Sequence, residues 1–365
     1  MMPRAALENM RALMFGPALC LALLVLGVAP AGAIVVSADH DLSVRLAPEQ
    51  RLLEGVDDIR LEITDESSLF FSLARGAQVE SVQLDGRKAH HSFSGRMLYV
   101  HLPPERRTGR VRLVVRWSAV FEDDFEERPL AMDMPGQGVE GTITAKGAFL
   151  LPGTGWYPEI DAGKRVFRLT VRAPRGMYAV TQGGLIGHED QGGESVSRWR
   201  IERPVGRLAL AAGQYLVGRT RSAGTDVYVY FTLANRGLMD RYLEAAARHL
   251  DFYEELLGPY PFEKFAVVEN FFPTGYGFPS FTSLGGAVLR LPFIPDTSLM
   301  HEIAHCWWGN GVLVDQDQGN WSEGLTTYLS DYLAQERLSP KAGVEYRLGV
   351  LRDYAGLASG ERDFP

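Results

Sequence analysis

Residues 299–310 have the sequence LMHEIAHCWWGN, which sets two histidines four positions apart in an apolar stretch. On an α-helix, residues four apart project from the same side, so the imidazoles of His301 and His305 can share one metal ion. Glu302 is close enough to hydrogen-bond a water on that ion, as the general base does in zinc hydrolases. Imidazole nitrogens joined by a carboxylate favour zinc over a hard cation.

The flanking sequence predicts that this stretch is helical. Residues 296–298 (DTS) offer N-cap side chains, and residues 309–310 (GN) are a typical stop, which puts both histidines in mid-helix. Leu299, Ile303 and Cys306 fall on the face away from the histidines, and Trp308 would wall the site with apolar surface. The alternative is a buried helix whose histidines only make hydrogen bonds.

A catalytic zinc takes three protein ligands, so a third must be found. Glu323 is the best candidate, because residues 320–333 (NWSEGLTTYLSDYL) carry Leu and Tyr at helical spacing and Ser322 can cap the helix. Asp315 and Asp317, in the intervening loop, are rivals. The sequence therefore predicts one zinc ion held between two helices.

HEIAHCWWGN followed by WSEGLTTYL resembles the gluzincin metallopeptidases of the membrane-alanyl-aminopeptidase and leukotriene-hydrolase family. The resemblance implies that His301, His305 and Glu323 hold one zinc ion, that Glu302 activates water and that the substrate is a peptide. The connection from the second histidine to Glu323 is one residue shorter than is usual in the family. Its glycines can absorb that difference without moving either helix.

A second family landmark, a Gly-x-Met-Glu-Asn substrate loop, is altered. Residues 271–282 have the sequence FFPTGYGFPSFT, in which Gly275 stands for the family glycine and Phe278-Pro279 replace the Glu-Asn that grips a free amine. Gly275 and Gly277 still allow close approach of a peptide backbone, and Tyr276 offers a hydroxyl. The alternative is a simple Gly/Pro turn between buried strands.

A third landmark, a downstream tyrosine that stabilises the oxyanion, has no match among Tyr328, Tyr332, Tyr346 and Tyr354. We therefore expect the sequence to be the front part of a longer enzyme with an incomplete catalytic domain. One oxyanion donor is worth about 10² to 10³ in turnover, so activity of this fragment is not assured.

The predicted fold class is α+β and multidomain. Residues 34–225 offer short alternating or β-branched stretches separated by Gly and Pro turns, which predicts a β-sandwich-like N-terminal domain. Within it, Trp156 and Tyr157 are expected to pack rather than to face substrate. Residues 226–365 begin with a helical repeat at 238–257 and fit the front of a thermolysin-like zinc catalytic domain.

The N-terminus predicts export. Arg4 and Arg11 precede an apolar stretch, and Ala31-Gly32-Ala33 is an A-x-A cleavage site, so residues 1–33 are expected to be a signal peptide. The mature protein would be periplasmic or extracellular and off the membrane; the alternative is an uncleaved N-terminal anchor. Cleavage would leave Cys306 as the single cysteine, which excludes a disulfide within the mature chain.

The composition indicates an ordinary soluble protein rather than a nucleic-acid binder, with a formal net charge of −8 and 22% charged residues. Two alternatives to a peptidase stay open. One is a non-catalytic peptide- or partner-binding module in which zinc staples two helices, and the other is a different zinc-dependent hydrolysis such as epoxide opening.

Overall fold

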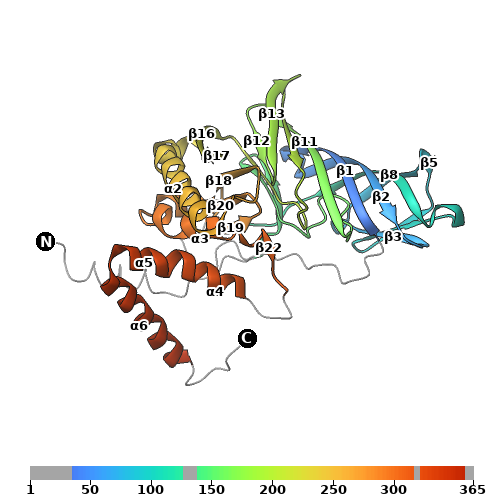
Figure 1. The fold of residues 1–365 in the computed structure, drawn as a ribbon. Helices are drawn as coiled ribbons and strands as arrows, with labels where there is room; N and C mark the ends of the chain where they lie inside the picture. Colours follow the sequence, from blue (N-terminus) through green and yellow to red (C-terminus); the bar gives the residue numbers. More distant parts are fainter. Residues whose placement is uncertain (1–34, 126–137, 316–320, 358–365) are drawn as a thin grey trace.

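The computed structural model describes residues 35–125, 138–315 and 321–357, and the predicted signal peptide lies outside them. A β-rich first part is followed by a mixed second part that carries the helices (Figure 1). Within the described ranges, no helix is both long enough and apolar enough to cross a membrane.

The first part is built on an eight-stranded sheet in the order β13-β14-β11-β1-β2-β8-β4-β5. Only the β1–β11 pair is parallel. In β8, buried and more exposed residues alternate, because successive side chains of a strand point to opposite faces. The strands are β1 (Val35–Ala47), β2 (Leu52–Ile63), β4 (Gln78–Leu84), β5 (Arg87–Lys88), β8 (Gly109–Val120), β11 (Lys164–Pro174), β13 (Gly184–Gln191) and β14 (Glu194–Ile201).

Two smaller sheets share a core with the large one. They are β3-β7-β6 and β12-β15-β10-β9. Their strands are β3 (Ser68–Ser72), β6 (His91–Ser94), β7 (Met97–His101), β9 (Gly141–Thr144), β10 (Gly147–Leu150), β12 (Tyr178–Val180) and β15 (Leu210–Gly213), and short 3-10 helices lie at η1 (Pro48–Gln50) and η2 (Pro104–Arg106). The predicted β-sandwich-like architecture is confirmed.

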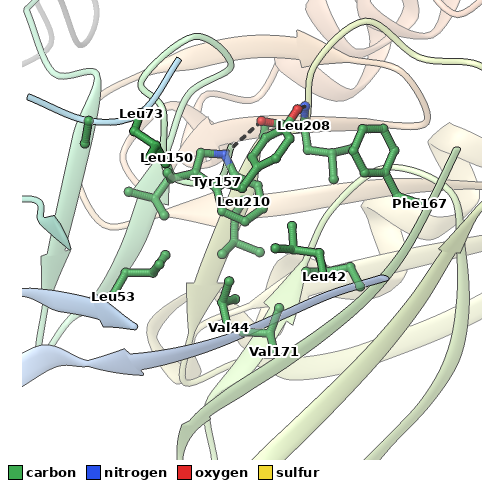
Figure 2. Close-up of a cluster of buried hydrophobic side chains, with 14 of the residues drawn as sticks. Leu42, Val44, Leu53, Leu73, Leu150, Tyr157, Phe167, Val171, Leu208 and Leu210 are labelled. Carbon is green, nitrogen blue, oxygen red and sulfur yellow. Dashed lines mark hydrogen bonds between the residues drawn. The ribbon is translucent and has the colours of Figure 1, made fainter. Parts of the chain in front are cut away.

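Trp156 and Tyr157 are part of this core, as expected from the sequence. Both are almost fully buried, Trp156 Nε1 donates to the Leu208 carbonyl at 2.9 Å, and the Tyr157 hydroxyl accepts from the Leu208 N–H at 3.2 Å. Figure 2 shows Tyr157 among aliphatic side chains, including Leu42 of β1 and Leu210 of β15. Neither aromatic ring is available to a substrate.

The second part begins with a five-stranded sheet in the order β16-β17-β18-β20-β19. Its strands are β16 (Leu216–Ser222), β17 (Thr225–Phe231), β18 (Lys264–Asn270), β19 (Gly275–Phe278) and β20 (Phe281–Gly285). The three central strands are parallel, and β16 and β19 run antiparallel at the two edges. Strand β16 precedes the boundary expected after residue 225 and pairs with β17 of this sheet.

Helices cover this sheet and continue to the end of the described chain. Helix α2 (Met239–Leu257) matches the predicted helical repeat, buries Tyr242, Leu250 and Tyr253, and ends at Gly258, whose φ is 95°. The remaining elements are η3 (Leu233–Leu238), η4 (Val288–Arg290), η5 (Ile294–Asp296), α3 (Ser298–Ala304), β21 (Trp308–Gly309), β22 (Val312–Leu313), α4 (Trp321–Thr327), the π-helix η7 (Tyr328–Tyr332), α5 (Leu333–Leu338) and α6 (Pro340–Leu357).

Candidate metal centre

Helix α3 carries the HExxH sequence but is shorter than predicted. It ends at Ala304, so His301 is inside the helix whereas His305 is its C-cap residue. The prediction that both histidines lie in mid-helix is therefore wrong for His305. Its backbone nevertheless stays in the right-handed helical region, and its N–H donates to the His301 carbonyl at 3.2 Å. The one-turn relation between the two imidazoles is kept.

Three candidate ligands converge from α3 and α4. The Nε2 atoms of His301 and His305 are 3.1 Å apart, and each lies 3.4 Å from an oxygen of Glu323. All of these ligand atoms fall within 4.8 Å of one another. Asp315 is described but is not part of the cluster, and Asp317 lies outside the described residues. Among the described residues, the geometry favours Glu323 over Asp315 as third ligand.

The start of α4 is fixed by a contact that differs from the predicted cap. Ser322 lies inside the helix, and its hydroxyl donates to the Trp308 carbonyl at 2.8 Å. Because Trp308 follows the metal helix closely, this bond ties the first turn of α4 to the end of α3. Glu323 sits in that turn, where a carboxylate is favoured by the helix dipole.

The Nδ1 atoms of both histidines, which point away from the cluster, have polar partners. His305 Nδ1 is 3.0 Å from the Trp308 carbonyl, which orients the ring with Nε2 free toward the cluster. His301 Nδ1 lies 3.4 Å from Ser330 Oγ and 3.9 Å from Asp331 Oδ2. The sequence reasoning missed Ser330 and Asp331, although an acid two turns after Glu323 was a usable signal. The π-helix η7 contains one residue more than an α-helical turn. Asp331, eight residues after Glu323, therefore lies on the helix face that the seventh residue would otherwise occupy.

Glu302 is buried beside the cluster with neither carboxylate oxygen hydrogen-bonded within the described residues. Burial raises its pKa, and His301 and His305 oppose that rise. Its carboxylate presses on strand β19: a Cβ at Gly277 would lie 2.4 Å from Glu302 Oε2, closer than any side chain permits. A side chain at position 277 would therefore displace the Glu302 carboxylate, and Glu302 faces the strand predicted to bind substrate.

The histidines and carboxylates of the cluster shift one another's pKa. Burial works to raise the pKa of Glu323, but hydrogen bonds to His301 and His305 outweigh it and bring the pKa to about 2. Burial disfavours protonation of His301, yet the carboxylates of Glu323, Glu302 and Asp331 together raise its pKa. This collection of negative charge around two imidazoles suits a cation.

Strand β19 holds Gly275, Tyr276 and Gly277 at an edge of the sheet, paired on one side with β20. It is a strand and not the simple turn considered as an alternative. The Tyr276 ring is buried against Phe149 and Phe278, with ring centroids 5.5 and 6.0 Å away. Its side chain thus joins the two parts of the molecule.

Comparison with known proteins shows which fold this chain resembles. The M1 zinc metallopeptidase of Deinococcus radiodurans superposes with a TM-score of 0.66 at 20% identity, covering 93% of this chain and 78% of that chain. A mutant of it bound to a Tyr-Ser-Ala substrate gives a TM-score of 0.67 at 19% identity, covering 91% and 76%. The chain has the fold of the M1 zinc metallopeptidases. The resemblance drawn from the motifs and the predicted α+β fold class are confirmed.

Curated relatives point to the same group at lower coverage. Human aminopeptidase RNPEPL1 is 26% identical over 199 residues, which are 50% of this chain and 25% of that protein. The mouse protein is 24% identical over 289 residues, which are 74% of this chain and 37% of that protein. The chain thus spans well under half the length of these relatives. No family model matches it.

Substitution of Glu323 tests the proposed ligand set. We expect Glu323→Ala to lower zinc content from about one ion per chain by about tenfold or more, because two imidazoles alone leave a catalytic zinc one protein ligand short. Elemental analysis after dialysis measures it, and Asp315→Ala is the matched control. Unchanged zinc in Glu323→Ala, with loss in Asp315→Ala or Asp317→Ala, would show that the third ligand lies in the loop.

Proposed function

We propose that the protein is a zinc-dependent metallopeptidase that hydrolyses peptide bonds. The observation that carries the proposal is the convergence of His301, His305 and Glu323 beside a buried Glu302 whose oxygens have no hydrogen-bond partner in the described chain. Two imidazole nitrogens and a carboxylate oxygen are the donor set of catalytic zinc sites, and the Nδ1 contacts hold the rings for it. The residues present therefore fit the ion.

The number of ligands favours catalysis over a structural role. A structural zinc is closed by four protein ligands, whereas the described residues supply a group of three. A position left for water is what hydrolysis requires. This supports the peptidase over the binding module in which zinc only joins two helices.

In the proposed mechanism, bound zinc supplies a Lewis acid that polarises the scissile carbonyl and lowers the pKa of a water molecule. Glu302 would accept a proton from the attacking water as the oxygen of the water adds to the carbonyl carbon. As the C–N bond breaks, Glu302 returns the proton to the leaving amine. Burial of Glu302, which raises its pKa, suits a group that must both take and return a proton.

Strand β19 is the proposed platform for the peptide. It is an edge strand of the described sheet, it lies close to Glu302 at Gly277, and Gly275 and Gly277 carry no side chain that would oppose an added strand. Main-chain hydrogen bonds along this edge would place a substrate carbonyl near the metal. Tyr276 contributes its backbone there, while its ring stays packed.

Replacement of the base tests the mechanism. We expect Glu302→Gln to keep its zinc while kcat falls by a factor of about 10² to 10⁴, because the amide preserves the shape of the side chain without its basicity. Zinc content and peptide hydrolysis are measured on the same preparation, with the exposed Glu345→Gln as control. Retained turnover with zinc bound would show that another base acts.

The altered substrate loop predicts weak dependence on a free α-amine. Phe278 and Pro279 replace the family's Glu-Asn, and the nearby Glu269 is already bonded to Thr232 and Asn235 at 2.7–2.9 Å. Loss of one charge-assisted hydrogen bond forfeits about 1.5 to 3 kcal/mol of discrimination. We therefore expect kcat/KM for matched free and N-acetylated peptides to agree within about tenfold. A preference for the free amine above about a hundredfold contradicts this.

We further propose that the protein is exported after cleavage behind Ala33, since the charged start, apolar stretch and A-x-A site form a signal peptide. The mature chain is then expected to begin at Ile34 in the periplasm or outside the cell. Mass spectrometry of the exported protein decides this, and retention of residues 20–33 would indicate an uncleaved anchor.

A further inference from the structure

Lys264 is a buried amine at the start of β18, far from the surface at 1% exposure. Its Nζ donates to the carbonyls of Thr181 (3.0 Å) and Ser280 (3.1 Å) and to Ser280 Oγ (3.0 Å). An ammonium has three donors, and these three acceptors match them. Burial lowers its pKa to about 7, as expected for an amine whose close partners are neutral.

The partners of Lys264 come from both parts of the molecule. Thr181 precedes β13, and the ring of Trp199, on β14, lies 5.2 Å from Nζ; both belong to the first part. Ser280 and Phe281, whose ring is 5.3 Å from Nζ, belong to the hairpin of β19 and β20. One side chain therefore joins the β-rich part to the turn of the proposed substrate hairpin.

That turn has an unusual backbone held by several bonds. Ser280 has a φ of 72°, in the left-handed region that disfavours residues other than glycine. Its Oγ accepts from the Gly183 N–H at 3.1 Å, and its carbonyl accepts from the Ala266 N–H at 3.1 Å. Such a conformation persists only where its surroundings fix it, and Lys264 supplies two of the bonds that do so.

The position of this turn matters at the metal helix. Gly277 lies three residues before Ser280 on a four-residue strand, and the Glu302 carboxylate occupies the space where a side chain of residue 277 would begin. A small movement of the turn is therefore transmitted to the strand edge beside Glu302. Lys264 itself does not touch the metal cluster, so any effect on substrate must pass through the hairpin.

We propose that Lys264 is a positioning residue that fixes the β19–β20 turn, and with it the peptide-binding edge of β19, against the metal helix and the N-terminal part. The proposal rests on the proposed peptidase function for its effect on substrate. Its structural half, the fixing of the hairpin, is measurable without catalysis.

Hydrogen–deuterium exchange of the expressed protein tests the structural half. Lys264→Met keeps the length and apolar packing of the side chain and removes all three hydrogen bonds. We expect amides of residues 275–285 to exchange about tenfold faster or more, with residues 239–257 of α2 unchanged. Ser280→Ala is a milder change in the same turn and should speed amide exchange of residues 275–285 less. The exposed Lys341→Met is the control.

Peptide hydrolysis tests the functional half. In Lys264→Met, KM for a peptide is expected to rise about tenfold with zinc content unchanged and kcat altered less than KM, and Lys264→Arg should recover part of the loss. Unchanged exchange at 275–285 in both Lys264→Met and Ser280→Ala overturns the proposal. So does faster exchange with an unchanged KM in an active enzyme. If the zinc-loaded wild type cleaves no peptide, the proposed function fails. The exchange data then test by themselves whether Lys264 fixes the β19–β20 turn.

Discussion

The contact between Gly277 and Glu302 is the constraint on which the rest of the site depends. A buried carboxylate without hydrogen-bond partners in the described chain stands where a side chain of Gly277 would begin, on an edge strand of the sheet. Any larger residue at position 277 would displace this carboxylate. Under the proposed function, the same closeness would bring a strand-bound peptide within reach of Glu302.

Around this contact, the metal cluster is oriented by atoms that are not ligands. The Trp308 carbonyl accepts a hydrogen bond from the Ser322 hydroxyl and contacts His305 Nδ1. One acceptor therefore orients the His305 ring and holds the helix that carries Glu323. On the other side, the π-helix turns Ser330 and Asp331 toward His301. Supporting contacts of this kind limit ring rotation and keep the metal-facing nitrogens available.

The two parts of the molecule are joined by the core and by polar contacts at the substrate hairpin. Phe149 of the first part packs on Tyr276, and the Tyr215 hydroxyl donates to the Glu269 carbonyl at 2.8 Å at the end of β18. Lys264 completes this joint at the opposite end of the same strand. The N-terminal part thus does more than precede the metal domain, because it contacts the strands that form the site.

The sequence by itself determined the features that depend on local spacing. The four-residue interval of His301 and His305, the apolar face of α3, the helical repeat of α2 and the alternating strands of the first part all follow from periods of 3.6 and 2 residues. Tertiary structure decided what depends on segments distant in sequence. It ended α3 at Ala304, brought Glu323 and not Asp315 next to the two histidines, inserted the π-helix that brings in Asp331, and buried Lys264 between two parts. Those outcomes depend on which backbone atoms meet in space, and local patterns do not contain that information.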